Sequence, residues 1–133
     1  MVEPGKVPYE TEVESGYKNI LKALDCDIFQ ATYPFEDMVA VLVDDESKLN
    51  GKPLNRALYD ADGEMYDILA GKFMIVGLGE EDFTDLSPEL MEKFKERFAH
   101  PESFHELFGK LLVVQEPIPG SSAPNKNKRG PDL

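Results

Sequence analysis

The sequence has a single cysteine, Cys26, no tryptophan and no long apolar run. One cysteine excludes an internal disulfide and every zinc site built from several cysteines. No stretch approaches the roughly 20 apolar residues of a membrane-spanning helix, so we expect no membrane partner. The opening MVEPGKVPYE lacks the apolar core of a signal peptide, which predicts a cytoplasmic protein.

Basic residues are also scarce. There are 14 of them against 26 acidic residues, and the formal net charge is −12. Three of the cations, Lys126, Lys128 and Arg129, lie near the C-terminus, which leaves the remainder more acidic still. Such a surface repels a phosphate backbone, so we expect no direct binding to nucleic acid. The acidity is explained either by solubility or by mimicry, in which acidic side chains occupy another protein's basic groove.

The N-terminal part predicts three strands and one helix. Residues 7–14, VPYETEVE, alternate between apolar and acidic as a half-buried strand does, and Pro8 assigns this strand to an edge. Ser15 is a capping residue for a helix over 16–24, whose apolar side chains recur at helical spacing. Strands are predicted over 27–33 and 38–43. The second is apolar on both faces and should be central, and the short connection favours an antiparallel pair.

The C-terminal part predicts one strand, two helices and a tail. Residues 73–78 form an apolar run that is typical of a buried strand. Ser87-Pro88-Glu89 begins a helix with a capping hydroxyl, a proline and an acid in the first turn. The spacing of apolar residues over 104–112 predicts a further helix.

These elements define an α+β fold in the order β-α-β-β-loop-β-α-α. We expect a small mixed or mostly antiparallel sheet with helices packed on it. A single domain should span residues 1–116, including a helical extension over 101–116. The proline- and serine-rich residues 117–133 predict a disordered tail.

A polar loop, NGKPLNRAL, lies between the predicted strands and carries the candidate binding site. A guanidinium with a neighbouring amide and amine can hold a phosphate or a carboxylate. The N-terminal segment would complete the site if it meets this loop. The alternative is that Arg56 pairs with a nearby carboxylate such as Asp60 or Asp67. The candidate ligand-binding residues are therefore Lys52, Asn55, Arg56, Asn50, Lys6 and Tyr9.

The remaining motifs do not define a catalytic centre. Residues 60–64, DADGE, lack the glycine position and final glutamate of a calcium loop and are better interpreted as an acidic hairpin turn. His100 and His105 have no HExxH motif or cysteine partner, and Cys26 lies between two acids that disfavour its thiolate. We therefore predict no catalytic residue, no cofactor and no metal, which favours a protein that is not an enzyme.

Four segments resemble a known family: VEPGKVPYE, YPFEDMVAVLVDDESKLNGKPLNRAL, DILAGKFMIVGLGEEDF and LSPELMEKFKERF. This is the uncharacterised domain of unknown function three-eight-four-six, found in bacteria, phages and integrative elements. The resemblance spans residues 2–104 and implies a recurring pattern at Pro4, Gly5, Lys6, Pro8, Tyr9, Asn50, Gly51, Pro53, Asn55, Arg56, Asp67, Ile68, Gly71 and Gly77. The family often has an apolar run before its Glu-Pro-Gly, so the first strand is expected to be shortened or absent here, or the start to lie upstream.

The resemblance implies a setting but no reaction. We expect a non-enzymatic binding protein of phage or mobile-element origin that holds an anionic small molecule, such as a nucleotide-like signal, and acts in evading host defence. A homo-oligomer is expected if the ligand lies between subunits. The alternative is an acidic interaction protein, or nucleic-acid mimic, that inhibits a host protein. A second alternative is a small metal-dependent hydrolase that uses Asp60, Asp62 and Glu64.

Overall fold

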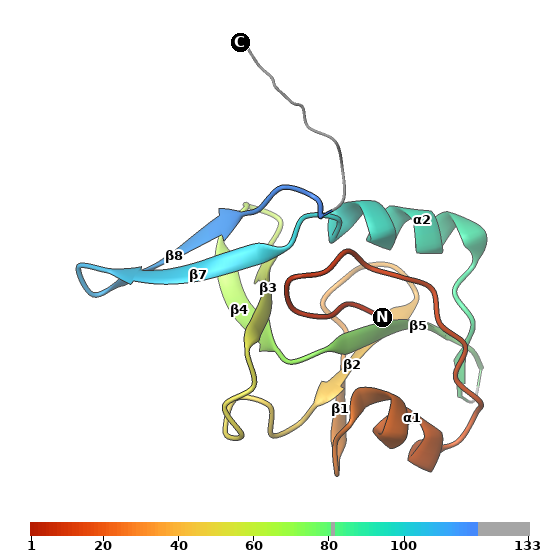
Figure 1. The fold of residues 1–133 in the computed structure, drawn as a ribbon. Coiled ribbons are helices and arrows are strands. Elements are labelled where there is room, and N and C mark those ends of the chain that lie inside the picture. The colour runs from red at the N-terminus through yellow and green to blue at the C-terminus, as the bar shows by residue number, and fades with distance from the viewer. Residues whose placement is uncertain (81, 120–133) are drawn as a thin grey trace.

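The computed structural model describes residues 1–80 and 82–119. Two helices and three antiparallel sheets make up this part of the chain (Figure 1). In chain order the elements are α1 (Tyr17–Leu24), β1 (Phe29–Thr32), β2 (Val39–Asp44), β3 (Leu54–Tyr59), β4 (Met65–Ala70), β5 (Phe73–Leu78), β6 (Phe83–Thr84), α2 (Pro88–Arg97), β7 (Glu102–Leu107) and β8 (Lys110–Gln115).

The central sheet has four strands in the order β1-β2-β5-β6, and every neighbouring pair is antiparallel. All six residues of β2 are buried, because β1 and β5 flank it and apolar side chains cover both of its faces. The prediction that this run forms a central strand is therefore confirmed. The predicted strand over 73–78 is confirmed with the same bounds.

The two helices cover opposite faces of this sheet (Figure 1). On one face, Phe94 and Phe98 from the α2 region pack with Val39, Val41 and Phe73. On the other face, Leu24 of α1 packs with alternate residues of the same strands, namely Ala40, Leu42 and Met74. The period of two along each strand thus divides its apolar side chains between two layers.

Both helices begin close to where the sequence predicts. The helix α2 starts with Ser87, whose hydroxyl accepts a hydrogen bond of 3.3 Å from the Leu90 N–H, followed by Pro88 at the first helical position. The helix α1 begins at Tyr17, and its N-cap is Gly16 with no side-chain cap, so the predicted cap at Ser15 is wrong. Asp25 follows its last residue, Leu24, and caps the C-terminal end in a left-handed conformation. An α+β fold with antiparallel sheets and two helices is the result.

The helix predicted over 104–112 is wrong, and with it the helical extension over 101–116. This stretch is the β7–β8 hairpin, with Glu102 paired to Gln115 and Leu107 to Lys110. The turn residues Phe108 and Gly109 both have positive φ, 52° and 77°, as a two-residue hairpin turn requires. Apolar residues on the two strands of this hairpin fall by coincidence at helical spacing.

The N-terminal strand predicted over 7–14 is also wrong, although the segment carries no turn or bend. In the described part of the chain its residues pair with no strand of the sheet. The polar loop and the residues that follow it contain two strands that the sequence analysis does not predict, β3 and β4. The Ala57 N–H ties this hairpin to Glu102 Oε1 of β7 at 2.8 Å. Most of the predicted tail, from residue 120, lies outside the described residues.

Candidate functional site

Arg56 and Asn55 lie in the core, at 0% exposure each. The Arg56 guanidinium donates to Asn55 Oδ1 at 2.8 Å, to the Lys6 carbonyl at 2.7 Å and to the Phe98 carbonyl at 2.9 Å. Asn55 Nδ2 donates to the carbonyls of Val2 at 3.0 Å and Gly71 at 2.8 Å. These hydrogen bonds connect the N-terminal segment, β3 and the end of α2. The Asn55 amide nitrogen and the Arg56 Nη2 nitrogen therefore already donate to backbone carbonyls.

The pKa of Arg56 is lowered by burial, and Glu102 acts against that shift. Neither carboxylate considered as an ion-pair partner contacts it. Asp67 binds Lys48 at 2.9 Å, and Asp60 closes the β3–β4 turn by accepting the Asp62 and Glu64 N–H groups, both at 2.9 Å. The interpretation of residues 60–64 as an acidic hairpin turn is thus confirmed.

Lys52 and Asn50 lie elsewhere, at a small pocket of about 280 Å³. The Lys52 ammonium binds Asp44 Oδ2 at 2.7 Å and the Asp25 carbonyl at 3.1 Å. Burial acts to raise the pKa of Asp44, but hydrogen bonds from Lys52 and the Glu46 N–H outweigh it, so this pKa lies below its usual value. Three carboxylates, those of Asp25, Asp27 and Asp44, border the pocket and disfavour an anion there.

Lys6 and Tyr9 converge on Glu3. The Tyr9 hydroxyl donates to Glu3 Oε2, and Lys6 Nζ lies 3.6 Å from Glu3 Oε1. The hydrogen bond to Glu3 is the main reason that the pKa of Tyr9 is raised to about 12. The six predicted residues therefore occupy three separate places. Lys6 and Arg56 are neighbours, but the contact uses the Lys6 carbonyl and not its side chain.

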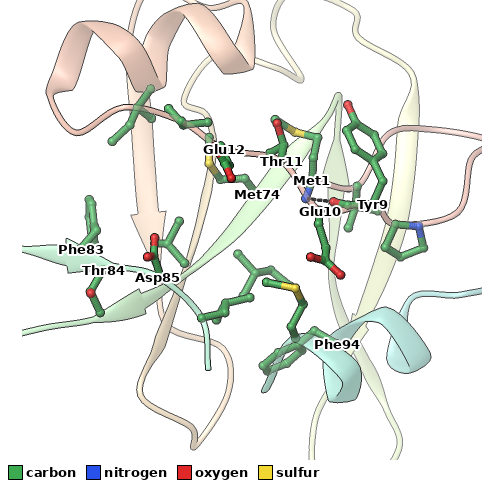
Figure 2. Close-up of a pocket in the computed structure, with 18 of the residues that line it drawn as sticks. Met1, Tyr9, Glu10, Thr11, Glu12, Met74, Phe83, Thr84, Asp85 and Phe94 are labelled. Atoms are coloured by element: carbon green, nitrogen blue, oxygen red, sulfur yellow. Dashed lines mark hydrogen bonds between the residues drawn. The ribbon is translucent and has the colours of Figure 1, made fainter. Parts of the chain in front are cut away.

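A larger cleft than the pocket at Lys52 lies elsewhere, with a volume of about 1000 Å³. Figure 2 shows its walls: the N-terminal segment with Tyr9, Glu10, Thr11 and Glu12 on one side, Phe83, Thr84 and Asp85 on another, and Phe94 of α2 below. The middle of β5, from Met74 to Val76, also lines it. The sequence does not indicate this cleft, because the alternation over residues 7–14 predicts an edge strand of the sheet and not the wall of a cleft.

The cleft combines an apolar interior with an acidic border. Met74, Ile75 and Val76 lie inside it, whereas its carboxylates come from Glu10, Glu12, Glu14, Asp82 and Asp85. Lys95 also lines the cleft, but its ammonium lies 3.0 Å from Glu10 Oε2 and is paired with that carboxylate. The Met1 ammonium donates to the Tyr9 carbonyl at 3.0 Å. The net field in the cleft therefore favours a positively charged partner.

Each histidine lies close to one neighbouring oxygen. His100 Nδ1 lies 3.0 Å from the Glu116 carbonyl, and His105 Nε2 lies 3.0 Å from Ser103 Oγ. Over residues 1–80 and 82–119, no group of three or more His, Cys, Asp or Glu side chains is placed to hold a metal ion. Burial is the largest cause that raises the pKa of Cys26. No helix in this part of the chain is long and apolar enough to span a membrane.

The structure defines a small α+β domain built on an antiparallel sheet, with a cleft between that sheet and its N-terminal segment. A family model, the domain of unknown function (DUF3846), matches residues 1–99. The chain belongs to this family, and the match contains both helices and the central sheet while the β7–β8 hairpin follows it. No curated protein and no solved structure matches the chain.

Proposed function

We propose that this chain is a non-enzymatic binding protein whose partner is a polypeptide with basic residues. The cleft between the N-terminal segment and β5 carries this proposal, because it joins an apolar interior to a border of carboxylates. An apolar interior supplies the free energy of binding, and the charged border selects the partner and speeds association. This corresponds to the acidic interaction protein considered from the sequence, and it places the partner in one cleft.

A displayed library of random seven-residue peptides, selected on the purified protein, tests the proposal. The expected result is enrichment of peptides that contain Lys or Arg beside apolar residues, with binding that weakens as salt rises. Neutralising the acidic wall with Glu10→Gln, Glu12→Gln and Glu14→Gln should weaken the selected peptides at least tenfold.

A second triple variant has the same change in charge away from the cleft. Its positions, Glu36, Glu46 and Glu106, are exposed and do not line the cleft, so Glu36→Gln, Glu46→Gln and Glu106→Gln should leave binding within about twofold. Equal losses in both triple variants would mean that net charge acts without a defined site. A library that yields no binder would overturn the proposal.

An anionic, nucleotide-like ligand is the second candidate, because Asn50 and Lys52 line the same small pocket. Since three carboxylates border this pocket, such a ligand would have to replace Asp44 as the partner of Lys52. Thermal melting against mono-, di- and cyclic nucleotides tests it, with Lys52→Ala as the matched variant. A bound ligand at a hundredfold excess over its Kd adds about 2.7 kcal/mol of stability. A shift in the wild type that Lys52→Ala removes would support this ligand. The roles in host-defence evasion and in homo-oligomers stay predictions.

A further inference from the structure

The strand β8 has one edge without a partner strand. In the described chain β8 pairs with β7 alone. The Glu116 N–H donates to the Pro101 carbonyl at 2.7 Å, which continues the β7–β8 ladder by one position. Every second residue of an antiparallel strand bonds to the same neighbour, so the even-numbered residues of β8 bond toward β7. The odd-numbered residues therefore direct their N–H and C=O groups away from β7, namely Leu111, Val113 and Gln115.

Apolar side chains are exposed on both faces of this edge strand. Five of the six residues of β8 are exposed, and Val113 is half-buried. Leu112 and Val114 lie on one face with 49% and 38% exposure, and Leu111 lies on the other face with 43%. The hairpin projects beyond β3 and β4 (Figure 1). Because a two-stranded hairpin is only marginally stable by itself, a further strand beside β8 would stabilise it and cover its apolar side chains.

The β8 edge is complementary to a second copy of itself. An antiparallel pair with its two-fold axis at Val113 places Leu111 opposite Gln115 of the second copy and Val113 opposite its own symmetry mate. Each outward residue then exchanges its backbone hydrogen bonds with an outward residue of the other copy. Moving the axis by one residue brings either Gln115 opposite the turn residue Gly109 or Leu111 opposite Pro117, which has no N–H to donate. The axis at Val113 therefore makes the fullest use of this edge.

Charges at the two ends of this register are complementary as well. Lys110 of each copy lies directly opposite Glu116 of the other, on the face that carries Leu112. The Ser103 hydroxyl donates to Glu116 Oε2 at 2.6 Å, which holds this carboxylate on that face. In residues 1–80 and 82–119 neither Lys110 nor Glu116 belongs to an ion pair. Exposed ion pairs contribute little affinity, so these two select the register while the apolar side chains supply most of the free energy.

We propose that the free edge of β8 binds the same edge of a second copy of this chain, in antiparallel orientation with the two-fold axis at Val113. The product is a four-stranded sheet, β7-β8-β8-β7, that is shared between two copies. Strand addition takes its affinity from backbone hydrogen bonds and its specificity from alternate side chains. No residue of β8 lines the cleft, so this inference goes beyond the proposed binding function and does not depend on it.

Analytical ultracentrifugation of the full chain, at concentrations from about 1 μM to about 1 mM, should show a monomer–dimer equilibrium. Val113→Pro removes an N–H that points away from β7, a position where an edge strand tolerates proline, and it blocks the approach of the second copy. We expect dimerisation to be at least tenfold weaker. The matched control is Val113→Thr, which keeps the N–H and the β-branched shape and should dimerise within about threefold of the original chain. Circular dichroism compares the fold of the two variants.

A mixing experiment tests the register. Lys110→Glu places like charges across both ends of the interface, and Glu116→Lys does the same with the opposite sign, so each variant should dimerise at least fivefold more weakly. In an equimolar mixture of the two variants, opposite charges face each other again at both ends. The mixture should therefore form heterodimers about as tightly as the original chain forms dimers. A variant that has merely lost its fold cannot be rescued in this way.

Amide hydrogen exchange locates the interface residue by residue. The backbone amides of Leu111, Val113 and Gln115 should exchange fast in dilute protein and at least tenfold more slowly at concentrations where the dimer forms. Those of Leu112 and Val114, which face β7 in the hairpin, should be protected at both concentrations. This alternation along one strand is specific to pairing at the free edge of β8.

Each outcome decides the inference. A chain that stays monomeric over the whole concentration range overturns it. A dimer that Val113→Pro weakens no more than Val113→Thr, with unchanged exchange along β8, has its interface elsewhere and also overturns it. If Val113→Pro unfolds the hairpin, the mixture and the exchange experiment decide, and the absence of both rescue and protection is contrary to the inference. Binding of library peptides in the cleft should be the same in the dimer and in Val113→Pro, so the proposed function is tested separately.

Discussion

Arg56 donates a hydrogen bond of 2.9 Å to the carbonyl of Phe98, the residue that caps α2 at its C-terminal end. The same guanidinium nitrogen donates to the Lys6 carbonyl at 2.7 Å. Arg56 thereby fixes α2 and the N-terminal segment, two walls of the cleft, to β3. This buried cation has a structural role because its two terminal nitrogens donate to backbone carbonyls and to Asn55 Oδ1 in place of a carboxylate.

Substituting Arg56 by alanine should therefore destabilise the fold. The change leaves the buried carbonyl of Phe98 and the partly buried carbonyl of Lys6 without their donor, which costs about 3 kcal/mol or more. Urea unfolding followed by circular dichroism measures the loss. The control is Arg97→Ala, because Arg97 is exposed and its guanidinium stacks on Phe35 at 4.6 Å, a contact worth about 0.5–1 kcal/mol. Equal losses in the two variants would contradict the structural role.

A substitution at Gly109 distinguishes the hairpin from the helix that the sequence predicts. In a helix, Gly109→Ala would add about 1 kcal/mol of stability. In the observed turn Gly109 has φ of 77°, where alanine is strained, so the variant should lose about 1 kcal/mol. Thermal melting gives the sign. Phe108→Asn is the matched control, since Phe108 is 95% exposed with φ of 52° and asparagine tolerates this conformation better, so it should not destabilise.

Three strands of the central sheet, β1, β2 and β5, and both helices could be predicted because local signals and burial agree there, whereas the two-residue strand β6 was missed. The apolar run of β2 and the Ser87-Pro88 cap each have one interpretation. The β7–β8 hairpin could not be predicted, because its apolar residues also fit helical spacing and its turn is marked by a single glycine, Gly109.

The site was harder to predict for a different reason. Arg56 and Asn55 have the composition of an anion site, and their burial depends on carbonyls from Lys6, Phe98 and Gly71, which are distant in sequence. The cleft lies between β5 and an N-terminal segment that forms no strand of the sheet in the described chain, and composition does not indicate that arrangement.

Tyr9 should titrate with a pKa of about 12. The neutral hydroxyl donates to the Glu3 carboxylate, and ionising the phenol would break this bond and place two negative charges together. Ultraviolet difference absorbance of phenolate against pH measures it, with Tyr9→Phe identifying the signal. Glu3→Gln should bring the pKa back toward the ordinary value of about 10. An unchanged Tyr9 titration in Glu3→Gln would contradict this contact.

Asp44 should make the fold less stable in acid. Its pKa is lowered in the folded state because hydrogen bonds from Lys52 and the Glu46 N–H outweigh the opposing effect of burial. A carboxylate whose folded pKa is depressed contributes stability above its unfolded pKa of about 4, and that contribution is lost as the pH falls through the folded pKa. Urea unfolding at pH 6 and at pH 3 measures the difference. Asp44→Asn removes the titrating group and Lys52→Met removes its cation, so each should reduce the difference between the two pH values. A difference that persists undiminished in both variants would assign the acid sensitivity to other carboxylates and contradict the role of this pair.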